Sequence, residues 1–149
     1  MAGITEVSSV EPVVSVIVST RNRAHYLGDS LQALTAQQCR RPYEIVVVDN
    51  GSTDGTAALL DEWTRRDLRV VRTSEPRLGL SCGKNAGIKV ARAPLLLFTD
   101  DDTLVDPRWI ETYLDFFDRR RDDFMIVGNQ DTGYWSSMRN LTRTAIVAL

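Results

Sequence analysis

The sequence is poor in the residues on which many metalloproteins and secreted proteins depend. It has one histidine and two cysteines, Cys39 and Cys82, in 149 residues. Neither cysteine belongs to a metal-ligand or redox motif, so the sequence argues against a Cys/His zinc site. Two unpaired cysteines fit a reducing compartment better than an oxidising one.

The chain also lacks an excess of either charge and any long apolar run. Its 18 basic and 20 acidic residues give a net charge of −2, which argues against nucleic acid as a partner. No stretch approaches the roughly 20 apolar residues of a transmembrane segment. Acidic residues, and no basic ones, precede the first apolar run, unlike a signal peptide. We therefore expect a cytoplasmic protein, with peripheral association with a membrane left open.

The common phosphate and metal motifs are missing as well. There is no GxGxxG, and GLSCGKN departs from a P-loop in its glycine spacing and in Asn85, where Ser or Thr is required. Leu104 and Val105 stand where an EF-hand would need an acidic residue and a glycine. Leu104 also breaks the DxDx[TV] phosphatase pattern.

What the chain does have is a regular alternation of apolar segments. Strands are expected at residues 13–19, 44–49, 68–73, 94–99 and 124–128. Helices are expected at residues 21–38, 51–66 and 78–93, and from Asp106-Pro107 onward. Apolar strands alternating with helices predict an α/β fold, a mostly parallel sheet with helices on both faces. We expect this domain to span residues 13–128, between a tail at 1–12 and a C-terminal segment at 129–149.

Polar side chains gather where three of these strands end. STRN follows the first strand, DNGSTDG the second and TDDD the fourth. Ligands of such sheets bind at the carboxyl ends of the strands. The sequence therefore predicts that the three segments form one site.

Three acidic side chains in a row, Asp100, Asp101 and Asp102, end the strand at 94–99. Two unit charges about 4 Å apart repel by ~1 kcal/mol in water and by ~4 kcal/mol at an effective dielectric constant of 20. The triplet is thus either a solvated loop or a site for a cation. Because Asp106 already stands in a helix-capping position, capping does not explain three more acids, and we favour the cation.

Four segments in order resemble those of family-2 glycosyltransferases: VSVIVSTRNR, YEIVVVDNGSTDGT, GLSCGKNAGI and LLLFTDDDTLVDPRWI. The resemblance covers residues 13 to 120 and implies a Rossmann-like GT-A domain that binds a nucleoside-diphosphate sugar of the UDP, GDP or dTDP type. It implies metal-dependent, inverting transfer of the sugar to a saccharide, lipid or protein acceptor that the sequence does not identify. Mg²⁺ or Mn²⁺ is the implied cofactor.

The resemblance also assigns roles to the acidic triplet, its D-x-D motif. Asp102 is expected to bind the metal, Asp100 the metal or the ribose, and Asp101 the nucleotide sugar. The other nucleotide-sugar-binding candidates are Thr20, Arg21, Asn22, Asp49, Asn50 and Lys84. Asp49 would accept a hydrogen bond from the nucleobase, although DNGSTDG also suits a turn. Lys84 stands where the family more often has arginine, and lysine lacks the bidentate fork.

The catalytic base of inverting members lies well beyond the acidic motif, and no residue here can be assigned that role. Residues 129–149 do not match the family's continuation. The alternative interpretation is a non-catalytic nucleotide-sugar-binding module, or an incomplete fragment without the acceptor half. A third is an α/β interaction domain whose acidic loop is merely solvated.

Overall fold

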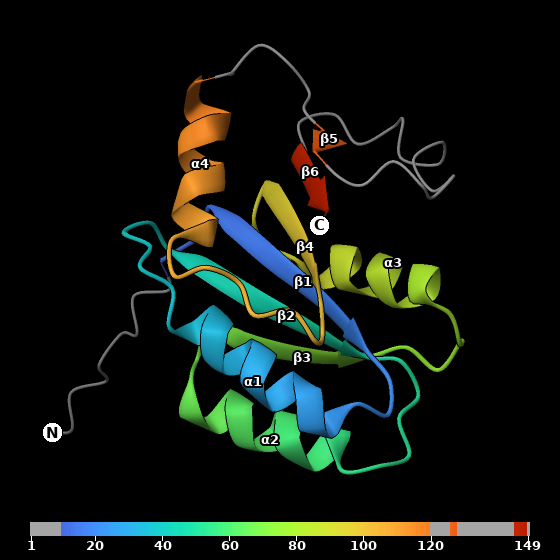
Figure 1. Ribbon diagram of the computed structural model, residues 1–149. Coiled ribbons are helices and arrows are strands. Elements are labelled where there is room, and N and C mark those ends of the chain that lie inside the picture. Colours follow the sequence, from blue (N-terminus) through green and yellow to red (C-terminus); the bar gives the residue numbers. More distant parts are fainter. Residues whose placement is uncertain (1–9, 120–125, 128–144, 149) are drawn as a thin grey trace, which may run out of the picture.

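The computed structural model describes residues 10–119, 126–127 and 145–148 (Figure 1). The strands are β1 (Val14–Thr20), β2 (Tyr43–Asp49), β3 (Val70–Ser74), β4 (Leu95–Asp100), β5 (Ile126–Val127) and β6 (Ala145–Ala148). The helices are α1 (Ala24–Thr35), α2 (Thr56–Arg66), α3 (Leu80–Val90) and α4 (Trp109–Arg119). No helix in these ranges is long and apolar enough to cross a bilayer.

The strands form one sheet in the order β3-β2-β1-β4-β6-β5, and all five pairs are parallel. The register places Thr20 of β1 beside Asp49 of β2, and Ser19 of β1 beside Asp100 of β4. The predicted parallel α/β fold is confirmed, and the ends of β1, β2 and β4 meet at one edge of the sheet.

Helices cover both faces of the sheet (Figure 1). One face packs its buried valines and leucines against α1, α2 and α4, including Leu31, Leu60 and Ile110. The other face packs against α3 and includes Ile17, Val48 and Phe98. Such double coverage explains why β1, β2 and β4 are buried at nearly every position rather than at alternate ones.

Two glycines let α3 lie directly on β1. A Cβ at Gly83 would stand 2.0 Å from Ser19 Oγ, and one at Gly87 would stand 2.5 Å from Ile17 Cγ2. The glycines at positions 79, 83 and 87 recur at helical spacing, and at 83 and 87 the reason is this close approach of helix and strand.

Some boundaries differ from those expected. The helix expected from Asp106-Pro107 begins at Trp109, because the Asp106 carboxylate accepts a hydrogen bond from Arg108 N–H (2.8 Å) in a separate turn. Asp54 lies one residue before the N-cap, Gly55, and accepts hydrogen bonds from the N–H and hydroxyl of Thr56. Of the strand expected at 124–128, the described part is Ile126–Val127.

Candidate functional site

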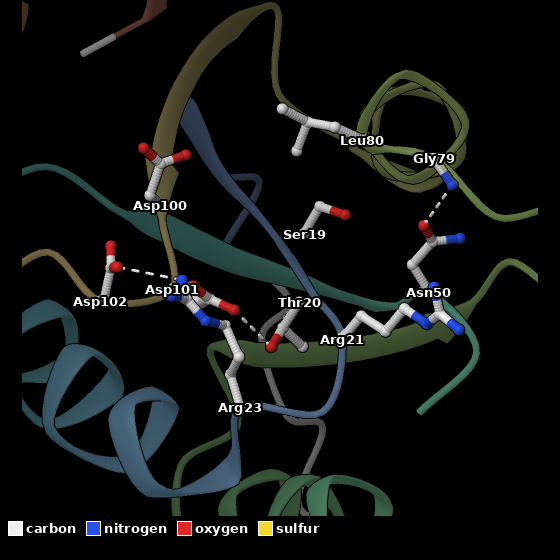
Figure 2. Close-up of a pocket in the computed structure, with 10 residues that line it drawn as sticks. All are labelled: Ser19, Thr20, Arg21, Arg23, Asn50, Gly79, Leu80, Asp100, Asp101 and Asp102. Atoms are coloured by element: carbon white, nitrogen blue, oxygen red, sulfur yellow. Dashed lines mark hydrogen bonds and ion pairs between the residues drawn. The ribbon is translucent and has the colours of Figure 1, made fainter. Parts of the chain in front are cut away.

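A pocket of about 430 Å³ opens at the carboxyl ends of β1, β2 and β4 (Figure 2). This volume is within the range of small-molecule sites, about 300–1,000 Å³. Its lining residues are Ser19, Thr20, Arg21, Arg23, Asn50, Gly79, Leu80, Asp100, Asp101 and Asp102. The three polar segments that the sequence places at strand ends therefore meet around one cavity.

The central acid of the triplet, Asp101, is buried and fully engaged. The residue is 5% exposed, and its carboxylate accepts hydrogen bonds from the Thr20 hydroxyl (2.7 Å) and from Arg23 Nη1 (3.0 Å). The hydrogen bond to Asp101 is the main cause that raises the pKa of Arg23. The side chains of Thr20 and Asp101 are thus hydrogen-bonded to each other. Asp101 links β1 to the end of β4 and fixes the position of Arg23 at the pocket.

Asp100 and Asp102 are different, because both are exposed. Asp102 accepts a hydrogen bond from the same Arg23 Nη1 (3.0 Å), whereas Asp100 extends from the end of β4 away from this arginine (Figure 2). No three acidic, histidine or cysteine side chains in the described parts of the chain are grouped to hold a metal by themselves. Mg²⁺ sites usually need only one or two carboxylates, because substrate phosphates supply further ligands. The two hard oxygen donors fit such a substrate-completed site.

The opposite wall of the pocket is held by Asn50, which is 4% exposed. Its Nδ2 donates to the carbonyl oxygens of Glu75 (2.8 Å) and Arg77 (2.7 Å), and its Oδ1 accepts a hydrogen bond from Gly79 N–H (2.9 Å). The Asn50 amide thereby fixes the loop from β3 to α3, including Gly79 at a φ of +131°, where glycine is favoured. All three contacts are with backbone atoms of this loop, so Asn50 shapes the pocket by holding the loop in place.

Arg21 is one of two exposed arginines that line the pocket, with Arg23. Within the described ranges it makes no ion pair, and Figure 2 draws its side chain extending away from the acidic triplet. Of the two arginines at the cavity, Arg23 is held by carboxylates and Arg21 is available for an anion.

Three of the predicted binding residues do not line the pocket. Asp49 accepts a hydrogen bond from Ser52 N–H (2.8 Å), in agreement with the turn interpretation. Asn22, at a φ of +55°, accepts a hydrogen bond from Thr53 N–H (2.6 Å) and so ties the first loop to the second. Lys84 Nζ lies 5.8 Å from the centroid of the Phe98 ring. Their contact with a ligand remains a prediction.

Four lining residues were absent from the prediction: Ser19, Arg23, Gly79 and Leu80. Gly79 and Leu80 enter through the loop from β3 to α3, whose path depends on the Asn50 contacts. Arg23 lies within the STRNR segment, but its partners are 78 and 79 residues away in the sequence. Only the acidic charge of the triplet could have suggested an arginine partner.

A family model and several known proteins are similar to this chain. The model of "Glycosyl transferase family 2" matches residues 15–143. The match therefore extends into the C-terminal segment 129–149, where the sequence motifs alone show no resemblance. Validoxylamine A glucosyltransferase of Streptomyces hygroscopicus subsp. jinggangensis is 35% identical over 106 residues, which are 69% of this chain and 25% of that protein. Among eight curated relatives, the chain spans 12% to 38% of the relative's length.

Two solved structures share the fold at similar identity. S. aureus TarS 1-349 in complex with UDP matches with a TM-score of 0.67 and 28% identity, over 84% of this chain and 38% of that one. Mannosyltransferase PcManGT from Pyrobaculum calidifontis, in complex with GDP-Man and Mn²⁺, matches with a TM-score of 0.67 and 27% identity, over 81% and 36%.

Proposed function

Because this chain belongs to glycosyltransferase family 2, we propose that it binds a nucleoside-diphosphate sugar in the pocket at the ends of β1, β2 and β4 and transfers the sugar to an acceptor. The observation that carries the proposal is the lining of this pocket, with two exposed carboxylates on one side and, on the other, an arginine that has no ion-pair partner among the described residues. A bridging divalent cation and a guanidinium can both stabilise the negative charge of a diphosphate.

Each side of the pocket has a proposed task. Asp102 and Asp100 would hold Mg²⁺ or Mn²⁺, and that ion supplies a positive charge that stabilises the departing diphosphate. Arg21 would bind the phosphates directly, since a guanidinium presents paired N–H donors to phosphate oxygens. Asp49, next to Thr20 in the sheet register, would accept a hydrogen bond from the nucleobase with the oxygen that does not hold Ser52 N–H.

The proposed reaction is direct displacement with inversion, in which the acceptor hydroxyl loses its proton to a base. Among the residues that line the described pocket, the triplet provides all the carboxylates. Asp101 is fixed by Thr20 and Arg23. The base is therefore not assigned to any described residue.

This lining also supports a second candidate function, a nucleotide-sugar-binding module without transferase activity of its own. The two candidates share the donor site and differ only in turnover. Binding measurements cannot separate them, and a product assay can.

The assay incubates the chain with UDP-, GDP- and dTDP-sugars and Mn²⁺, with and without added acceptors, and measures released nucleoside diphosphate. Transferase activity predicts release from one nucleotide class, and loss of this release in Asp102→Asn. The matched control is Asp61→Asn, the same substitution at an exposed acid of α2 away from the pocket. Binding of a donor without any release would favour the module, and release unaffected by Asp102→Asn would contradict the proposed site.

A further inference from the structure

One nitrogen of Arg23 joins two of the three acids. Nη1 lies 3.0 Å from Asp101 Oδ1 and 3.0 Å from Asp102 Oδ2. A guanidinium has five N–H donors, and these two contacts use only Nη1. The guanidinium also lies over the Tyr26 ring, with Cζ 5.3 Å from the ring centroid. The N–H groups other than those of Nη1 can still donate to an anion while the contact with Asp101 is kept.

The two contacts differ in strength because their surroundings differ. Asp101 is buried, with a side chain 6% exposed, and is also held by the Thr20 hydroxyl. The Asp102 side chain is 43% exposed, and no other partner holds its carboxylate among the described residues. An exposed ion pair contributes little and exchanges readily. The ion pair of Arg23 with Asp101 is therefore the stronger one, and its ion pair with Asp102 is the weaker and more easily broken one.

The position of Arg23 bears directly on the proposed metal site. The positive charge of Arg23 occupies one side of the carboxylate that is proposed to bind Mg²⁺ or Mn²⁺. A divalent ion arriving alone must displace this contact and remain near a like charge. The phosphates of a donor would attract the guanidinium and offset that repulsion.

We propose that Arg23 is an internal counter-cation of Asp101 and Asp102, which competes with a divalent ion for Asp102 until a diphosphate binds. This inference rests on the proposed function. Its consequence is that metal and donor bind cooperatively: the metal binds weakly to the empty pocket and firmly in the presence of the diphosphate.

The test measures Mn²⁺ binding to the intact chain by electron paramagnetic resonance, first without nucleotide. Arg23→Gln is expected to bind Mn²⁺ about tenfold more tightly than the unmodified chain, because a unit and a double charge a few ångströms apart repel appreciably even in water. Arg21→Gln is the matched control, since it removes the same charge from the same pocket without touching an acid. It should change Mn²⁺ affinity much less.

The second arm adds UDP or GDP. Here Arg23→Gln should bind Mn²⁺ and nucleotide less cooperatively than the unmodified chain, so that its advantage with Mn²⁺ alone disappears. Tighter binding of Mn²⁺ alone, together with weaker binding of the nucleotide, is the result expected of a counter-cation. If Arg23 had only a structural role, its replacement would weaken the binding of both Mn²⁺ and nucleotide. Combining Arg23→Gln with Asp102→Asn should abolish the gain in Mn²⁺ affinity, because the two residues act on the same site.

Circular dichroism and thermal unfolding establish that each variant is folded. If Arg23→Gln does not fold, Arg23→Met takes its place, since methionine also removes the charge while keeping a long side chain, and it should likewise bind Mn²⁺ about tenfold more tightly. An Mn²⁺ affinity that is unchanged or lower in a folded variant would overturn the inference and leave the proposed function standing. If the unmodified chain binds neither Mn²⁺ nor nucleotide, the proposed function fails as well.

Discussion

Three neighbouring aspartates at the end of β4 have different surroundings, which determine what each can do. Asp101 is buried between Thr20 and Arg23, Asp102 shares Arg23 but is exposed, and Asp100 is exposed and extends away from Arg23 (Figure 2). A row of like charges is tolerated because one member is neutralised internally and the other two face water. Structural and binding roles are therefore divided within one triplet.

This division predicts unequal effects on stability. Asp101→Ala should lower the free energy of unfolding by about 1–3 kcal/mol, since it leaves the buried Thr20 hydroxyl without its hydrogen-bond partner. Asp102→Ala should change it by less than about 1 kcal/mol, as expected for an exposed ion pair. Urea denaturation of both variants measures the difference. Equal losses would contradict the anchoring role given to Asp101.

Glu75 predicts a dependence of stability on pH. Its carboxylate accepts hydrogen bonds from the side chain and N–H of Arg77, and chiefly the former lowers its pKa from 4.5 to about 2. The unfolded chain therefore takes up a proton more readily than the folded one, and stability should fall as the pH drops from about 4.5 to about 2. Chemical denaturation at several pH values checks this. Glu75→Gln should flatten the slope in that window, and an unaltered slope would contradict the assignment.

At the scale of elements, the close contact of α3 with β1 positions the side of the pocket that α3 forms. Gly83 allows Ser19 to face the cavity, and Gly87 lies against Ile17 and Val48. The same contact brings the first turn of α3, with Gly79 and Leu80, to the pocket. A side chain at either glycine would push the helix away from the strand that carries Thr20.

The glycines of two helices give a matched prediction. Gly87→Ala should destabilise the protein by about 1–3 kcal/mol, because its Cβ would overlap Ile17 Cγ2 in a packed core. Gly28→Ala, in α1, should stabilise it by about 0.5–1 kcal/mol, since nothing lies within 4 Å of its Cβ position and alanine favours the helix. Thermal unfolding measures both. Effects of the same sign would contradict the packing described here.

At the scale of the whole molecule, the fold could be predicted from the sequence because it depends on local patterns. Apolar runs and helical spacing were sufficient to place β1, β2 and β4. The carboxyl ends of parallel strands must also meet at one edge of the sheet. The helix expected from Asp106-Pro107 is present, but it begins at Trp109 because a turn at Arg108 comes first.

The site could be predicted only in part, because its side-chain contacts join distant segments. The sequence placed Thr20, Arg21 and the acidic triplet at the pocket through their strand ends. It could not show that Arg23 joins Asp101 and Asp102, nor that Asn50 is committed to the loop before α3. Side-chain contacts of this kind depend on rotamers and on the paths of loops. The periodicity of apolar residues in a sequence gives no information on either.

The central claim is that exposed carboxylates of the triplet bind a diphosphate through a divalent ion. Titration calorimetry of UDP, GDP and dTDP, each with Mn²⁺ and with EDTA, tests this claim most directly. We expect one nucleotide to bind with Mn²⁺, its affinity to fall by at least about tenfold with EDTA or in Asp102→Asn, and Asp61→Asn to behave like the unmodified chain. Nucleotide affinity that is the same with Mn²⁺, with EDTA and in Asp102→Asn would contradict the claim.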